Sequence, residues 1–207
     1  SLKEVAIDMP AGPSEVEVIA DESANPAFIA ADFLSQAEHG VDSQAMLVTA
    51  SESIVEPIMQ AIREQLDRLP RKEITEKSLS HSRLIVLKDK QEVIDFTNLY
   101  APEHLIIQTT DYADIAGQVE NAGSVFMGSY TPESAGDYAS GTNHTLPTNG
   151  YAKAYSGVNL DSFIKKITFQ EITADGIKQL GGTIQTMAAN EQLDAHKNAV
   201  TIRLNTL

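Results

Sequence analysis

The chain contains no cysteine, and this absence limits its chemistry from the start. Disulfides, thiolate metal sites and cysteine nucleophiles are excluded, so any bound metal has to be held by nitrogen and oxygen ligands. Basic residues are also few, because 15 Lys and Arg stand against 29 Asp and Glu, which gives a formal net charge of -14. Such a chain without a basic patch repels nucleic-acid phosphates and anionic lipid. We therefore expect neither nucleic acid nor a membrane as a partner.

Long apolar runs are missing as well. No stretch approaches the roughly 20 residues that a membrane helix needs, and the first residues lack the charged-then-apolar order of a signal peptide. A cytoplasmic location is the simplest interpretation. The chain opens Ser1-Leu2-Lys3 without an initiator Met and enters a strand-like run at once, which suggests a fragment or a processed product.

The first two thirds of the chain alternate short apolar runs with longer amphipathic segments. This alternation is typical of a sheet flanked by helices and favours a largely parallel α/β fold. Asn25 followed by Pro26 has the pattern of a helix start. We expect strands at 16–20, 45–49, 83–87, 105–108 and 124–127, and helices at 26–40, 54–69, 92–100 and 112–121, with another short helix after Pro70.

The character of the sequence changes after Gly128. A segment rich in Gly, Ser, Thr, Asn and Pro comes first, and helical spacing returns at 175–189 and 191–204. Neither of these helices is long enough to bury its apolar side alone, so both should dock on something larger. We predict an incomplete Rossmann-like domain over residues 1–152, which carries a site loop, and a C-terminal helical arm over residues 153–207.

The predicted site loop runs from Glu133 to His144 and gathers metal ligands and proton carriers without helical or strand periodicity. Ordered loops of this length are usually functional, and small residues beside single charged ones suit a close-fitting polar site. Asp137 and His144 are its candidate functional residues. Taken singly, each is also typical of a protein surface.

Two residue pairs add candidate chemistry. Gln36 and His39 lie three positions apart at the end of a predicted helix, where they could share a metal, although such a pair is commonly a solvated helix end. Glu103 and His104 directly precede an apolar strand. A carboxylate beside an imidazole can divide acid and base duties, and the alternative is a turn with a surface ion pair.

Five separated stretches together resemble histidinol dehydrogenase, in the order of that family. The resemblance spans the whole chain and corresponds to the C-terminal half of the enzyme, without its N-terminal half. It implies a zinc-containing enzyme that uses NAD to oxidise L-histidinol through an aldehyde to L-histidine, at the end of histidine biosynthesis. The stretches are Gly12-Pro13-Ser14-Glu15, Ser35 to Gly40, Pro102-Glu103-His104-Leu105, Glu133 to His144 and Ala195 to Val200.

The resemblance also implies a role for each matched residue. Glu103 would activate the water that attacks the aldehyde, and His104 would take the proton of the alcohol. The substrate's amine and imidazole would complete a zinc shell, and His144 would line the site or lie behind it. The implied zinc ligands are Gln36, His39, Asp137 and His196, and the implied further substrate contacts are Ser14, His104 and Glu191.

The family resemblance further implies a homodimer, because the tail with Glu191 and His196 crosses to the neighbouring subunit in that family.

No G-x-G-x-x-G pattern follows a strand here, and Gly181-Gly182 does not begin one, so no nucleotide site can be identified in this chain. The main NAD contacts are expected on the absent half, and the isolated fragment is expected to be inactive. A metal-dependent binding module without catalysis and a purely structural dimerisation fragment remain alternatives.

Overall fold

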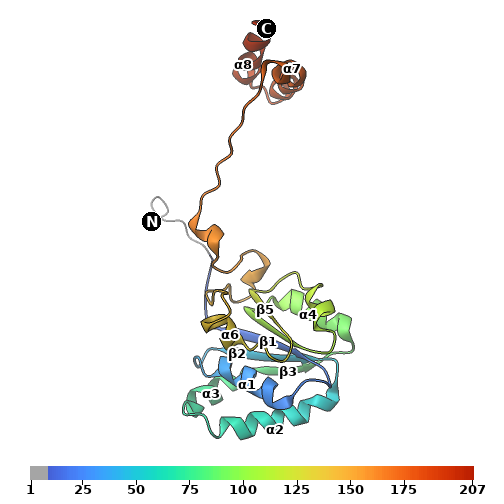
Figure 1. Ribbon diagram of the computed structural model, residues 1–207, viewed down its shortest axis with the longest axis vertical. Coiled ribbons are helices and arrows are strands. Elements are labelled where there is room, and N and C mark those ends of the chain that lie inside the picture. The colour runs from blue at the N-terminus through green and yellow to red at the C-terminus, as the bar shows by residue number, and fades with distance from the viewer. Residues whose placement is uncertain (1–8) are drawn as a thin grey trace. The chain divides into compact units, whose positions relative to one another are not determined.

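The computed structural model describes residues 9–207, so the strand-like run expected at the very start lies outside the described residues. Two compact units make up the chain (Figure 1), one ending at Ile164 and the other formed by Lys165–Leu207. The predicted boundary after residue 152 falls earlier in the chain than this division.

A parallel sheet of five strands forms the centre of the first unit, in the order β3-β2-β1-β4-β5. All four strand pairings are parallel, so a crossover connects each strand to the next. The order reverses between β1 and β4, as in doubly wound sheets. The predicted α/β fold is therefore confirmed. The strands are β1 (Glu15–Ala20), β2 (Gln44–Thr49), β3 (Arg83–Val86), β4 (His104–Gln108) and β5 (Ser124–Met127).

Helices connect the strands, and the first begins as the sequence predicts. The Asn25 side chain accepts a hydrogen bond of 2.9 Å from the backbone N–H of Ala27, and Pro26 occupies the first helical position, where its missing N–H is not needed. The other helices of this unit follow in the expected alternation. The elements are α1 (Pro26–Ala37), η1 (Glu52–Ile54), α2 (Val55–Leu66), α3 (Lys72–Leu79), α4 (Lys90–Tyr100), α5 (Tyr112–Ala116), α6 (Glu133–Tyr138), η2 (Tyr151–Lys153) and η3 (Leu160–Phe163).

Two apolar layers enclose the sheet. Because side chains alternate along a strand, Val16 and Val18 of β1 face the core under α1 and α2, whereas Ile19 faces the core under α4 and α5. Figure 1 shows α1, α2 and α3 along one face of the sheet and α4 on the other. The central strand β1 is buried along its whole length, so the core holds both its amino and its carboxyl end in place.

Several predicted elements have different ends in the structure. Helix α1 ends at Ala37, so His39 lies beyond the helix rather than on its last turn, and α5 ends at Ala116 before Gly117 instead of continuing to residue 121. The predicted site loop is also partly regular, because Glu133–Tyr138 form α6. Six residues that include Gly136 are too few to show a helical period in the sequence, which explains the wrong prediction of an irregular segment.

The second unit is a pair of helices, α7 (Ala174–Asn190) and α8 (Asp194–Leu204), that pack against each other. Gln185 donates a hydrogen bond of 2.6 Å from Nε2 to Oγ1 of Thr201 across the pair. Several large apolar side chains of the unit stay exposed, among them Met187 at 60%. Across residues 9–207, no helix combines the length and apolar character that crossing a membrane requires.

Candidate active site

Glu103 and His104 lie at the amino end of β4, where His104 is in register with Val16 of the central strand. Their side chains are almost completely buried, with 4% and 3% of the residue exposed. The chain enters this position through Ala101, which has a left-handed backbone (φ 57°) and ends α4. A left-handed non-glycine residue costs roughly 1–2 kcal/mol, so the surrounding contacts have to enforce this turn.

The carboxylate of Glu103 is held through one oxygen. Its Oε2 accepts hydrogen bonds from Oγ of Ser14 at 2.8 Å and from the backbone N–H of Glu15 at 2.9 Å. The backbone of Gly123 passes close by, because an added Cβ there would be 2.5 Å from the carbonyl oxygen of Glu103. Ser14 and the start of β1 therefore fix this carboxylate, and the approach to β5 packs on the main chain of Glu103. Ser14, for which the sequence implied a substrate contact, orients Glu103 in the structure.

The hydrogen bonds of His104 assign its tautomer. Its Nδ1 is 3.1 Å from the backbone carbonyl oxygen of Glu15. A carbonyl oxygen only accepts, so Nδ1 carries the hydrogen and the neutral ring has its lone pair on Nε2. Nε2 is buried and has no hydrogen-bond partner among residues 9–207. In its neutral form His104 thus presents Nε2 as a base, and the main-chain carbonyl of Glu15 fixes Nδ1 on the other side of the ring.

Glu133 faces this free nitrogen, although the sequence interpretation gave it no role. Its Oε1 lies 3.9 Å from Nε2 of His104, and the residue is only 2% exposed. Helix α6 reaches this position because Gly136 packs on the ring of Phe126, where an added Cβ would be 2.5 Å from Cε1. The spacing of Glu133 and Asp137, one helical turn apart, is a signal that could have indicated a functional helix.

Burial and charge set the protonation of these groups. Burial raises the pKa of Glu133 to about 7, and the negative charges of Asp137 and Glu103 add to the increase. Burial lowers the pKa of His104, but the contact with Glu103 and the charges of Glu133 and Glu103 outweigh it, so the pKa rises to about 9. The imidazole is therefore a strong base for a histidine and holds a proton once it has taken one.

Among the described residues, Gln36 has the buried, unpaired side chain that is relevant to metal binding. Its side chain on α1 is completely buried, and neither Oε1 nor Nε2 finds a hydrogen-bond partner in the described part of the chain. An unsatisfied buried amide costs about 1–3 kcal/mol. Coordination through Oε1 would satisfy the oxygen, so this residue fits the position of a metal ligand.

Comparison with known proteins decides the family. The sequence model of histidinol dehydrogenase matches residues 2–204. The chain belongs to the histidinol dehydrogenase family. It is 70% identical over 207 residues to histidinol dehydrogenase of Bacteroides thetaiotaomicron, which covers 100% of this chain and 48% of that protein. It is also 58% identical over 204 residues to the chloroplastic histidinol dehydrogenase of Arabidopsis thaliana, over 98% of this chain and 44% of that protein.

A solved structure agrees with this family assignment. The crystal structure of histidinol dehydrogenase from Elizabethkingia anophelis is similar with a TM-score of 0.95 and 58% sequence identity, and the match covers 98% of this chain and 47% of that one. The chain therefore spans about half the length of the curated relatives that it matches. The family predicted from five short sequence stretches is confirmed.

The structure gathers part of the residue set that the histidinol dehydrogenase resemblance implies. Ser14 and the exposed His39 line one cavity of about 400 Å³, and the half-buried Asp137 lies on the same short helix as Glu133. Glu191 and His196 are exposed residues of the second unit, and His144 is exposed in the first. Within residues 9–207, no group of three or more His, Asp and Glu side chains forms a metal cluster. The implied ligand set stays a prediction.

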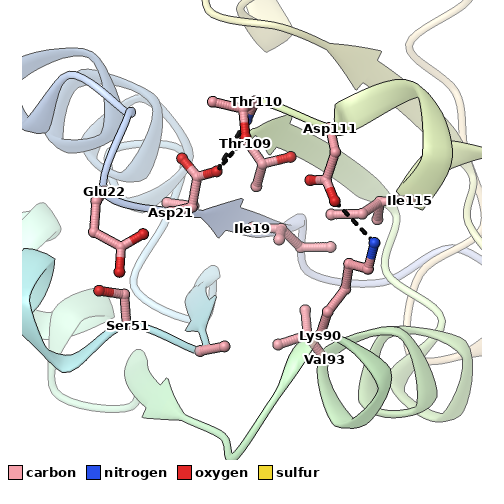
Figure 2. Close-up of a pocket in the computed structure, with 12 residues that line it drawn as sticks. Ile19, Asp21, Glu22, Ser51, Lys90, Val93, Thr109, Thr110, Asp111 and Ile115 are labelled. Atoms are coloured by element: carbon pink, nitrogen blue, oxygen red, sulfur yellow. Dashed lines mark hydrogen bonds and ion pairs between the residues drawn. The ribbon is translucent and has the colours of Figure 1, made fainter.

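A second cavity of about 220 Å³ lies at the carboxyl edge of the sheet, where doubly wound folds commonly bind ligands (Figure 2). The charged side chains that line it are largely paired with neighbours. Lys90 donates to Asp111 at 2.9 Å, and Asp21 accepts from the backbone N–H of Thr110 at 2.9 Å. None of the residues implied by the family resemblance lines this cavity. The candidate active site of this histidinol dehydrogenase segment is therefore at the amino edge.

Proposed function

We propose that the complete protein containing this chain is a cytoplasmic enzyme that oxidises L-histidinol through the aldehyde to L-histidine, and that this chain supplies the acid/base site. One observation carries the proposal: the buried His104 is fixed at Nδ1 by a main-chain carbonyl, so that the neutral ring presents Nε2 as a base beside Glu103. Membership of the histidinol dehydrogenase family supports the choice of substrate.

Glu103 and His104 perform different tasks in this proposal. His104 takes the proton of the alcohol at Nε2, and Glu103 activates the water that attacks the aldehyde. The hydrogen bonds from Ser14 and from the N–H of Glu15 orient the carboxylate for that second task. Burial of both groups excludes bulk water, so only a positioned water reaches the aldehyde.

Zinc is the metal that we propose for this site. The residues that would hold it are Gln36, His39, Asp137 and His196, a set of oxygen and nitrogen donors that suits zinc in a chain without thiolates. The unsatisfied amide of Gln36 supports this assignment. When bound, zinc supplies positioning of the substrate's amine and imidazole.

A homodimer is the assembly that we propose, with His196 and Glu191 completing the site of the neighbouring subunit. The apolar side chains that the second unit leaves exposed support it, because such residues are commonly covered in an assembly. Leu180, Met187 and Ile202 are each 50% exposed or more. L-histidinol would then contact residues from two copies of the chain.

Between residues 9 and 207, no part of the structure fits a dinucleotide site. No glycine-rich pattern follows a strand, and the cavity at the carboxyl edge is lined by Asp21, Glu22 and Asp111, which disfavour phosphates. When bound, NAD supplies the hydride acceptor. We assign its site to the part of the relatives' length that this chain does not cover.

The proposal is tested on the complete protein with Glu103→Gln and His104→Asn. We expect both variants to bind L-histidinol in calorimetry with zinc present and to lose NADH formation by about 100-fold or more, since each removes a proton carrier. Glu120→Gln, an exposed carboxylate, is the matched control and should keep full turnover. Binding of histidinol by the unaltered protein without any turnover would contradict the proposal and favour a binding module.

A further inference from the structure

Glu133 is a buried carboxylate that the family resemblance leaves without a role. Its Oε2 has no hydrogen-bond partner among the residues that the structure describes, and its Oε1 lies 3.9 Å from Nε2 of His104. A buried charge is costly unless an opposite charge faces it. The cation that this site can itself form is the imidazolium of His104.

The groups packed around His104 come from β1, β5, α6 and the turn before β4. The backbone carbonyl of Glu15 on β1 accepts from Nδ1, and Oε2 of Glu103 lies 3.5 Å from the same nitrogen. The ring of Phe126 on β5 lies 6.0 Å from the imidazole, centre to centre, and offers no charge. On the Nε2 side, Glu133 of α6 is the carboxylate in contact, with the charges of Asp137 and Asp32 farther out.

We propose that Glu133 is a positioning residue for the reaction, which aligns the Nε2 edge of His104 and stabilises the imidazolium formed when Nε2 takes the proton of the substrate hydroxyl. The inference rests on the proposed function, because it concerns the same proton transfer. The proton passes from the hydroxyl oxygen to Nε2, the O–H bond breaks and an N–H bond forms. Above the pKa of about 7 that burial gives Glu133, its side chain is a carboxylate before and after this step.

The arrangement has a consequence that a structural role alone would not produce. A carboxylate near Nε2 makes His104 a stronger base, and it also keeps the ring protonated up to a higher pH. Without that charge, more of the enzyme has a neutral imidazole at lower pH, but each neutral ring is a weaker base. Removing the charge should therefore slow the reaction more at high pH than at low pH.

The first experiment follows His104 directly in the 207-residue chain by side-chain ¹⁵N NMR. We expect Glu133→Gln to lower the titration midpoint of His104 by about one to three pH units, and Glu133→Asp, which keeps the charge, to stay closer to the unaltered chain. Glu120→Gln should leave the midpoint unchanged. An unchanged midpoint in Glu133→Gln, with the fold intact by the backbone spectrum, would overturn the inference.

The second experiment measures turnover of L-histidinol by the complete enzyme from about pH 7 to about pH 9, the range over which His104 loses its proton. The rate ratio of the unaltered enzyme to Glu133→Gln should increase with pH, and Glu133→Asp should restore part of the rate. A ratio that is constant across this range would overturn the inference. If the unaltered enzyme does not oxidise histidinol, the proposed function fails instead, and the NMR titration still decides the role of Glu133.

Discussion

At the scale of single residues, Glu17 shows how burial controls protonation next to the site. It lies on the central strand with no exposed surface, and Thr97 donates a hydrogen bond to its Oε1. Burial raises the pKa of Glu17 to about 8 from an ordinary value of 4.5. Between these two pKa values, Glu17 is therefore protonated in the folded chain and ionised in the unfolded chain. Its contribution to stability is complete below the unfolded pKa and is lost as the pH rises through the folded pKa.

We predict that Glu17→Gln flattens the pH dependence of stability. The Gln side chain does not titrate, so the free energy of unfolding should lose the part of its pH dependence that comes from Glu17. That part is a decrease of at most about 1.4 kcal/mol per pH unit as the pH rises between the two pKa values. Urea unfolding at several pH values within that window measures the slope. A residual slope is expected from Glu15 and Asp32, whose pKa values burial also raises to about 7. Equal slopes in Glu17→Gln and in Glu120→Gln would refute the prediction.

His39 is the residue that tests the metal assignment. It is exposed and lies just beyond the end of α1, so its replacement would remove the proposed ligand without disturbing the core. In the complete protein, His39→Ala should lower bound zinc strongly after dialysis, by about tenfold or more in metal affinity. His81→Ala, another histidine outside the site, is the control. Unchanged zinc content in His39→Ala by elemental analysis would rule out the ligand role.

At the scale of secondary-structure elements, the short helix α6 depends on one close contact. Gly136 lies against the ring of Phe126, so a methyl group there would push α6 away from the sheet and Glu133 away from His104. We predict that Gly136→Ala destabilises the fold by about 1–3 kcal/mol through overpacking. It should also weaken turnover in the complete enzyme.

The double variant Gly136→Ala with Phe126→Leu checks this reason, because the smaller side chain opens space for the methyl group. Thermal unfolding and NADH formation should recover together in that variant, relative to Phe126→Leu alone. If Phe126→Leu brings no recovery of either quantity, the contact with Phe126 does not explain the requirement for glycine.

The elements also show what the sequence could and could not predict. Strand and helix types follow from apolar periodicity over several turns, and the fold class was predicted correctly from that pattern. The burial of Glu133 could not be predicted, because α6 has too few residues for a period and owes its position to a contact with Phe126. The tautomer of His104 depends on the carbonyl of Glu15, and only the pairing of β1 with β4 brings these residues together.

At the scale of the whole molecule, the chain represents about half the length of its relatives, and the residues proposed for the site lie in both of its units. The proposed acid/base pair, Glu103 and His104, lies in the first unit, whereas Glu191 and His196 lie in the second. We predict that the 207-residue chain alone forms no NADH from L-histidinol, because we assign the dinucleotide site to the part of the relatives' length that this chain does not cover. A spectrophotometric assay at 340 nm over hours suffices as a test. NADH formation above the rate of a His104→Asn control would contradict the prediction.

Ser14, Glu103 and His104 lie at the amino edge, so the acid/base chemistry that we propose does not involve the loops at the carboxyl edge of the same sheet. Those loops follow β1, β2 and β4, and they run over the surface, where changes in chain length are tolerated best. A fluorophore or an affinity tag placed in an exposed part of these loops would then report on the protein from a distance. The segments before the strands offer no such freedom, since a single added residue there would shift the reactive groups themselves.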